Sequence, residues 1–284
     1  MLVSLRELLQ EAKRGRYAIG AFNFSNLETL RAIILAAQRR SAPVIIQTSQ
    51  TAIKYAGLEY IVAMARVAGE QAGVPVVLHL DHGTDLATIE ACIKAGYSSV
   101  MIDASHHSFT ENIRLTKEVV AMAHAHGVSV EAELGRLAGQ EDEISVGERE
   151  AAFTDPAEAR AFVEETGVDA LAVAVGTAHG LYRGEPHLDF LRLQQIAELV
   201  SIPLVLHGAS GVPDASIRQA IACGISKINI DTELRIAFYR AVKNFLDHHD
   251  TYDPRKFLSP AIDAMAELVE AKIDLFGSAN KAVR

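Results

Sequence analysis

Short apolar segments alternate with longer amphipathic segments along most of the chain. The apolar segments have the length and composition of strands that are buried on both faces. We predict eight strands, at Ile19–Asn23, Val44–Thr48, Val76–Asp81, Ser99–Asp103, Val128–Leu134, Ala170–Val175, Leu204–His207 and Lys227–Ile230. Between them the hydrophobic residues recur at helical spacing, as Leu30, Ile33, Ile34 and Ala37 do.

This alternation predicts an α/β fold in which helices cover a parallel sheet. Eight such units favour a closed (β/α)8 TIM barrel. A doubly wound open sheet is the alternative, but no Gly-rich dinucleotide fingerprint follows the first strand. A further amphipathic helix, from Ser259 to Gly277, is predicted after the eighth unit as an extra C-terminal helix. No Pro- or Ser-rich linker divides the chain, so we predict a single domain over residues 1–284.

One connection is longer than a minimal barrel needs. Residues 135–154 are acidic and contain glycine, and they follow the C-terminal end of the fifth predicted strand. A solvated surface loop and a mobile active-site lid both fit this segment.

Composition narrows the classes of partner and location. The net charge of −9 argues against a nucleic-acid or anionic-membrane partner, because both attract basic surfaces. Arg6, Glu7 and Glu11 interrupt the N-terminal segment, so no signal peptide is expected. No apolar run reaches the length of a membrane span. We therefore expect a cytoplasmic protein.

Polar side chains gather at the C-terminal ends of the predicted strands, where TIM barrels place their active sites. They include Asp81, His82, Asp103, Glu131, Glu133, His179 and His207. Burying such groups costs several kcal/mol unless they are paired or bind a metal. Three histidines from three strand ends favour a catalytic Zn²⁺ site with an open position. Pro75–His79 and Pro203–His207 form a short internal sequence repeat. By this repeat, His79 would be the histidine equivalent to His207.

Two polar turns follow the seventh and eighth strands. They are Gly208–Gly211 and Asn229–Thr232, and both are rich in small polar residues. Many barrels bind a phosphate here through backbone N–H groups. Together the two turns predict a phosphate site.

At these positions the sequence resembles the class II, metal-dependent ketose-bisphosphate aldolases over nearly its whole length. It looks most similar to the tagatose-1,6-bisphosphate aldolases, with the fructose-1,6-bisphosphate aldolases next. The stretches that carry the resemblance are His79–His82, Ser99–Ser105, Val130–Gly135, Gly139–Asp142, Gly176–Gly180, His207–Gly211 and Lys227–Asn229. The implied reaction is reversible cleavage of tagatose 1,6-bisphosphate, or alternatively of the fructose isomer or another phosphorylated ketose.

The resemblance also implies roles for individual residues. It assigns the catalytic Zn²⁺ to His82, His179 and His207, and so selects His82 where the internal repeat would select His79. It makes Asp81 the proton donor and acceptor at the cleaved carbon and Glu141 the base for the dihydroxyacetone-phosphate proton. Acidic groups near a second or alternative metal position match Asp103 and Glu133. Substrate contacts match Ser49, Gly180, Gly208, Ala209, Ser210, Asn229, Ile230, Asp231 and Thr232.

Several questions stay open at this point. The resemblance implies a homodimer or homotetramer and leaves a monovalent cation near the phosphate undecided. A Schiff-base aldolase needs a buried lysine nucleophile. The sixth strand has none, and Lys227, at the start of the eighth, is expected at the barrel end opposite the chemistry. A non-catalytic subunit that stabilises an aldolase is the third reading, but it need not keep the ligands and the acid present here.

Overall fold

Eight parallel strands close into a barrel in the computed structural model, which describes residues 2–141, 144–146, 152–180, 182, 184 and 186–282. Around the barrel the order is β1-β11-β10-β8-β5-β4-β3-β2. The strands are β1 (Ile19–Asn23), β2 (Val44–Thr48), β3 (Val76–Gly83), β4 (Ser99–Ile102), β5 (Ser129–Leu134), β8 (Ala170–Val173), β10 (Leu204–Leu206) and β11 (Ile225–Ile230). The predicted TIM barrel is confirmed, with every predicted strand present; β1 and β2 have the predicted bounds, and the other strands differ by one or two residues at an end.

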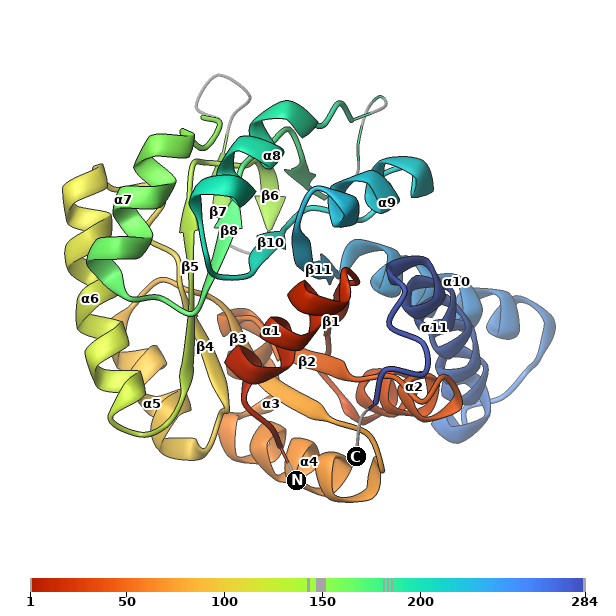
Figure 1. Ribbon diagram of the computed structural model, residues 1–284. Helices are drawn as coiled ribbons and strands as arrows, with labels where there is room; N and C mark the ends of the chain where they lie inside the picture. Colours follow the sequence, from red (N-terminus) through yellow and green to blue (C-terminus); the bar gives the residue numbers. More distant parts are fainter. Residues whose placement is uncertain are drawn as a thin grey trace.

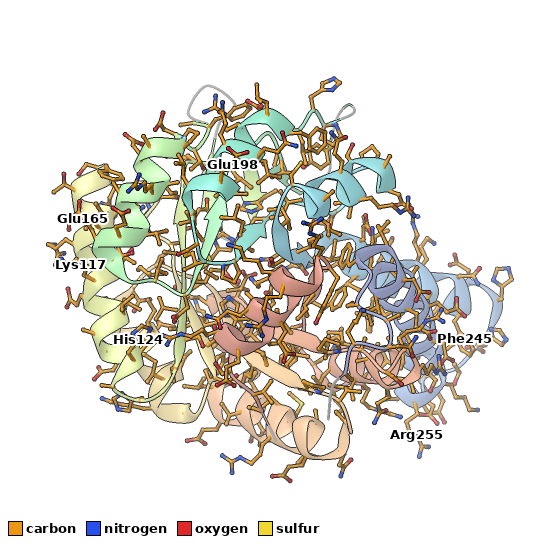
Figure 2. All side chains as sticks on the ribbon, viewed as in Figure 1. Lys117, His124, Glu165, Glu198, Phe245 and Arg255 are labelled. Carbon is orange, nitrogen blue, oxygen red and sulfur yellow. The ribbon has the colours of Figure 1, made fainter. Side chains whose placement is uncertain are left out.

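Helices surround the barrel, and Figure 1 shows α5, α6, α7 and α8 following one another around one side. The helices are α1 (Leu5–Gly15), α2 (Leu27–Arg39), α3 (Gln50–Ala56), α4 (Leu58–Gln71), α5 (Leu86–Ala95), α6 (Phe109–His124), α7 (Pro156–Thr166), α8 (Phe190–Leu199), α9 (Asp214–Ala222), α10 (Thr232–His248) and α11 (Pro254–Phe276). Figure 2 places Lys117, Glu165 and Glu198 on the outer surface of α6, α7 and α8. Among the described helices, none has the length and apolar composition that crossing a membrane requires.

Strand alternation divides the apolar residues between two regions. Outward-facing strand residues pack against the helices. Inward-facing residues near the strand starts form a smaller cluster with Leu5, Leu9 and Ala12 of α1. Its strand members are Ile19, Ala21, Ile45, Val77, Ala170, Ala172 and Val205. Helix α1 therefore closes the N-terminal end of the barrel, and the inward positions become polar toward the other end.

The long connection after β5 has secondary structure of its own. It contains β6 (Ala138–Glu141) and β7 (Ile144–Val146), which join β9 (Ala178–His179) in a sheet of order β7-β6-β9. Strand β6 pairs in parallel with β9, so Gly139 lies opposite His179. A Cβ on Gly139 would lie 2.2 Å from the His179 carbonyl oxygen, which explains the glycine. This part of the connection therefore packs directly against a site residue, and its predicted role as a surface loop or an active-site lid stays a prediction.

The extra C-terminal helix is confirmed and is longer than predicted. Helix α11 begins after the N-cap Asp253 and ends at Gly277, which has a φ of 74°. The prediction started it at Ser259 because Pro260 usually marks a helix start, whereas here Pro260 lies inside the helix. Helix α11 packs along α10 and α2, as Figure 1 shows.

Candidate metal centre and active site

Three histidines from three segments converge at the C-terminal end of the barrel. One side-chain nitrogen each from His82, His179 and His207 lies within 4.8 Å of the others. One ring nitrogen of His82 and one carboxylate oxygen each from Asp103 and Glu133 also lie within 4.8 Å of one another. The structure therefore brings together all five predicted metal ligands.

His82 reaches this cluster through an irregularity in β3. In a regular strand neighbouring residues face opposite sides, so the alternation that turns His79 and Asp81 inward would turn His82 outward. Instead His82 has a φ of 46°, and the pairing of β3 with β4 shifts register between Leu80 and Gly83. A left-handed conformation is costly for a non-glycine residue and is typical of functional positions.

His79 lies elsewhere. Its side chain is fully buried, its Nδ1 is 2.9 Å from Ser99 Oγ, and it belongs to neither metal-like group. Burial and the nearby Lys227 hold the pKa of His79 well below its usual value, so it is neutral. The structure thus groups His82, and not His79, with His207.

Carboxylates orient the imidazole rings of His82 and His207. His82 Nδ1 lies 2.8 Å from Asp103 Oδ2, and His207 Nε2 lies 2.8 Å from Glu131 Oε1. Burial lowers the pKa of His207, which favours its neutral form. Burial is the largest single influence on the pKa of Asp103 and would raise it. The hydrogen bond and charge interaction with His82 and the hydrogen bonds from Ser105 together outweigh burial and hold that pKa below its usual value.

This arrangement leaves one ring nitrogen of each histidine facing the other. If His82 Nδ1 and His207 Nε2 each carry the proton and donate it in a hydrogen bond to their carboxylates, then His82 Nε2 and His207 Nδ1 each carry a lone pair. These two nitrogens lie 3.0 Å apart. Two nitrogens bound tetrahedrally to one Zn²⁺ at about 2.0–2.1 Å lie about 3.3 Å apart. The donor set and its carboxylate partners therefore fit a metal ion.

Asp81 is held by three amide side chains. Its Oδ2 accepts from Asn23 Nδ2 at 3.0 Å and Gln47 Nε2 at 2.9 Å, and its Oδ1 accepts from Asn229 Nδ2 at 3.1 Å. Asp81 is fully buried, and its nearest oxygen is 4.0 Å from His82 Nε2. It is therefore fixed beside the metal-like cluster.

Asn23 and Gln47 were not predicted as site residues from the sequence. Both lie at the C-terminal ends of predicted strands, and both occupy inward-facing positions of β1 and β2. Extending the survey of polar strand ends to the first two strands would have found them.

Lys227 is in a different place from the one predicted. It is the third residue of β11 and is fully buried inside the barrel, where its Nζ lies 2.8 Å from Glu131 Oε2. The expectation that it lies far from the chemistry was wrong, because β11 starts two residues earlier than predicted. Glu131 connects Lys227 to His207, so this lysine forms an ion pair beneath the histidine cluster.

We expect Lys227→Met to lower the free energy of unfolding of the metal-free protein by about 3–5 kcal/mol, because it leaves a buried carboxylate without its cation. Urea denaturation measures the change. Lys94→Met is the matched control, since Lys94 pairs with Glu90 at 2.6 Å on the surface of α5. That variant should change stability by less than about 1 kcal/mol. Equal effects of the two substitutions would contradict this interpretation.

The predicted phosphate turn at 208–211 lies next to the histidines. Gly208, Ala209 and Ser210 follow His207, and Gly208 has a φ of 62°. A Cβ on Gly208 would meet the Ala178 carbonyl oxygen at 2.5 Å. The Tyr182 hydroxyl accepts from Ala178 N at 2.8 Å and donates to Gly208 O at 2.7 Å, so it ties the two segments together.

The remaining predicted substrate residues take separate positions. Asp231 precedes α10 at Thr232, Ile230 is buried, and Gly180 has a φ of 87°. Ser49 caps α3 by accepting from Ala52 N. Glu141 ends β6, and its side chain lies outside the described residues.

A cavity of about 410 Å³ lies beside β1, α3 and α10. Its walls include Asn23, which binds Asp81, together with Ser49 and Asp231. Arg235 is the cationic residue among its lining side chains, and it pairs with Asp231 at 2.7 Å. Arg235 was not predicted as a site residue, because a lone arginine one turn into a helix carries no signal by itself.

Comparison with known proteins gives a consistent result over the full length. The profile of the family described as fructose-bisphosphate aldolase class-II matches residues 3–281. A fructose-bisphosphate aldolase from Geobacillus stearothermophilus is 48% identical over 287 residues, covering 100% of this chain and 99% of the relative. One from Helicobacter pylori is 47% identical over 306 residues, covering 99% and 100%.

Solved structures agree with these relatives. The YdjI aldolase from Escherichia coli superposes with a TM-score of 0.89 at 40% identity, covering 100% of both chains. The fructose-bisphosphate aldolase from Campylobacter jejuni superposes with a TM-score of 0.85 at 26% identity, covering 99% of this chain and 97% of that one.

Proposed function

The chain belongs to the class II fructose-bisphosphate aldolase family and is a lyase, and we propose that it cleaves fructose 1,6-bisphosphate with the help of Zn²⁺. The products are dihydroxyacetone phosphate and glyceraldehyde 3-phosphate. The observation that carries this proposal is the position of Asp81 beside the cluster of His82, His179 and His207.

The choice of sugar rests on the relatives. Two curated relatives at 47–48% identity over almost the whole chain are named fructose-bisphosphate aldolases. They favour the fructose isomer over the tagatose reading of the sequence motifs. The two sugars differ in configuration at C4. The ratio of kcat/KM for the two bisphosphates therefore tests directly which one is the substrate.

A metal ion at the histidine cluster would supply a Lewis acid that stabilises the negative charge formed on the ketose half. His82, His179 and His207 would hold it, with Asp103 and Glu131 orienting two of them. We assign Asp103 and Glu133 to a second or alternative metal position, because a carboxylate oxygen of each lies within 4.8 Å of a His82 ring nitrogen. Neutral imidazole is the usual ligand form for Zn²⁺, and burial favours that form in His207.

Asp81 handles the proton of the reacting bond. During cleavage the C4 hydroxyl gives its proton to Asp81, the C3–C4 bond breaks, and its electron pair stays on the dihydroxyacetone-phosphate half as an enediolate. The aldehyde half leaves with a new C4=O bond. The amides of Asn23, Gln47 and Asn229 fix the carboxylate, so the transfer needs no reorientation of Asp81. We assign protonation of the enediolate carbon to Glu141.

Two sites would hold the two phosphates. The turns at 208–211 and 229–232 offer backbone N–H groups near the histidines and suit the phosphate of the dihydroxyacetone half. The cavity lined by Asn23, which binds Asp81, suits the other end of the sugar, with Ser49 and Arg235 in its wall. Phosphate groups far from the cleaved bond help to orient it.

We expect Arg235→Met to lower kcat/KM for fructose 1,6-bisphosphate by about tenfold to a hundredfold, because a hydrogen bond to a charged group contributes about 1.5–3 kcal/mol. Cleavage of fructose 1-phosphate, which lacks the second phosphate, should change by less than about threefold. Steady-state kinetics on both substrates test this. A similar fall in kcat/KM for both substrates would show that Arg235 does not bind the second phosphate.

The proposed substrate is tested by measuring kcat/KM for fructose 1,6-bisphosphate and tagatose 1,6-bisphosphate on the zinc-loaded protein. Faster cleavage of the fructose isomer supports the proposal. Faster cleavage of the tagatose isomer, or cleavage of neither, would replace the sugar while leaving the family unchanged.

A further inference from the structure

Glu233 occupies an unusual position at the phosphate turn after β10. Its Oε1 accepts from Gly211 N at 2.6 Å, and its own backbone N–H donates to Ser210 Oγ at 3.4 Å. Both contacts join the first turn of α10 to the 208–211 turn. They also place a carboxylate on a backbone N–H group of the proposed anion site.

The extra helix supplies the matching cation. Lys272 lies on α11 and is only 9% exposed, among the buried residues Val269, Ile273 and Phe276. Its Nζ lies 2.6 Å from Glu233 Oε2. A lysine is seldom buried to this extent without a specific partner. The pair therefore links α11 to the phosphate turn through one carboxylate.

We propose that Lys272 is a positioning residue for phosphate binding, acting by neutralising the Glu233 carboxylate that holds Gly211. This inference rests on the proposed function, because it assumes that the 208–211 turn binds a phosphate. It assigns to α11, which lies outside the eight β/α units, a role in the substrate site.

The electrostatic reason is direct. A carboxylate bonded to Gly211 lies within a few ångströms of any phosphate on the same turn, and like charges at that distance in a partly buried site repel strongly. Lys272 cancels this repulsion and leaves the Glu233 hydrogen bond to orient the turn. Removing only the lysine charge should therefore weaken phosphate binding, whereas removing both charges should restore it.

The test measures the Kd of inorganic phosphate for the zinc-loaded protein by isothermal titration calorimetry. Lys272→Met should raise the Kd by about tenfold. Adding Glu233→Gln, which keeps the acceptor for Gly211, should return the Kd to within about threefold of the wild-type value. Lys243→Met is the matched control, because Lys243 pairs with Asp247 at 2.8 Å on the exposed face of α10. It should leave the Kd unchanged.

Kinetics and zinc content separate positioning from a general structural effect. In Lys272→Met the KM for the sugar bisphosphate should rise by about tenfold while zinc content stays at the wild-type level and kcat changes by less than about threefold. Glu233→Gln alone keeps Lys272 and should bind phosphate at least as tightly as the wild type, so it tests the inference even if Lys272→Met does not fold.

Two results would overturn the inference. One is an unchanged Kd in Lys272→Met, and the other is a double variant that binds phosphate as weakly as Lys272→Met. A wild-type protein that binds no phosphate would instead contradict the proposed phosphate site itself.

Discussion

Asp81→Ala is expected to lower kcat for sugar bisphosphate cleavage by about 10²–10⁴-fold, the usual contribution of a well-placed acid–base group. Asp81 is the fully buried carboxylate that three amides hold beside the histidines. Alanine removes the acceptor of the C4 hydroxyl proton and leaves the imidazole nitrogens in place. Zinc content should therefore stay at the wild-type level, and the KM should change much less than kcat.

Asp85→Ala is the control for this variant. Asp85 lies four residues further along and caps α5 by accepting from Thr88 N at 2.8 Å. Its loss should cost about 1 kcal/mol of stability and leave kcat within about twofold. If Asp81→Ala kept kcat within tenfold of the wild type, Asp81 would not be the proton-transfer group.

His82→Ala is expected to lower kcat for cleavage at least as much as Asp81→Ala does, because the variant loses the metal. Metal stabilisation of developing charge contributes several kcal/mol, or about 10³-fold or more in rate. The same loss should follow removal of metal from the wild-type protein with EDTA. Added Zn²⁺ should restore the wild type and leave His82→Ala inactive. Activity assays paired with metal analysis by mass spectrometry measure both effects.

His79→Ala distinguishes the two histidines of β3. His79 is buried against Ser99 and lies in neither metal-like group, so its loss should reduce stability while zinc still binds with one equivalent per chain. If His79→Ala bound no zinc and His82→Ala still did, His79 and not His82 would be the zinc ligand on β3.

The barrel was predictable because its signals are local. Each strand is a short apolar run, and β1 and β2 have the predicted bounds because turn residues mark both ends. The start of β11 was missed because Ile225 and Ser226 follow Gly224, which reads as part of the preceding turn. That two-residue error placed Lys227 at the end of the barrel opposite the chemistry in the prediction.

The site was harder to predict because it depends on backbone irregularity and on distant contacts. The position of His82 at a strand end made it a candidate, but regular alternation turns His79 inward instead, and only the resemblance to the family chose His82 over His79. The φ of 46° that turns His82 into the cluster is not visible in a sequence. The contact between Lys272 and Glu233 joins two helices through side chains far apart in the chain. Spacing alone carries no information about such a pair.

Metal dependence is the central claim, and trapping experiments on the wild-type protein test it most directly. Fructose 1,6-bisphosphate cleavage would be followed before EDTA treatment, after it, and after Zn²⁺ is added back, with borohydride treatment in parallel. We predict that cleavage is lost with EDTA, returns with Zn²⁺ and is unaffected by borohydride in the presence of substrate. Cleavage that survives EDTA and is lost on borohydride treatment would contradict the claim, because it would require a lysine Schiff base.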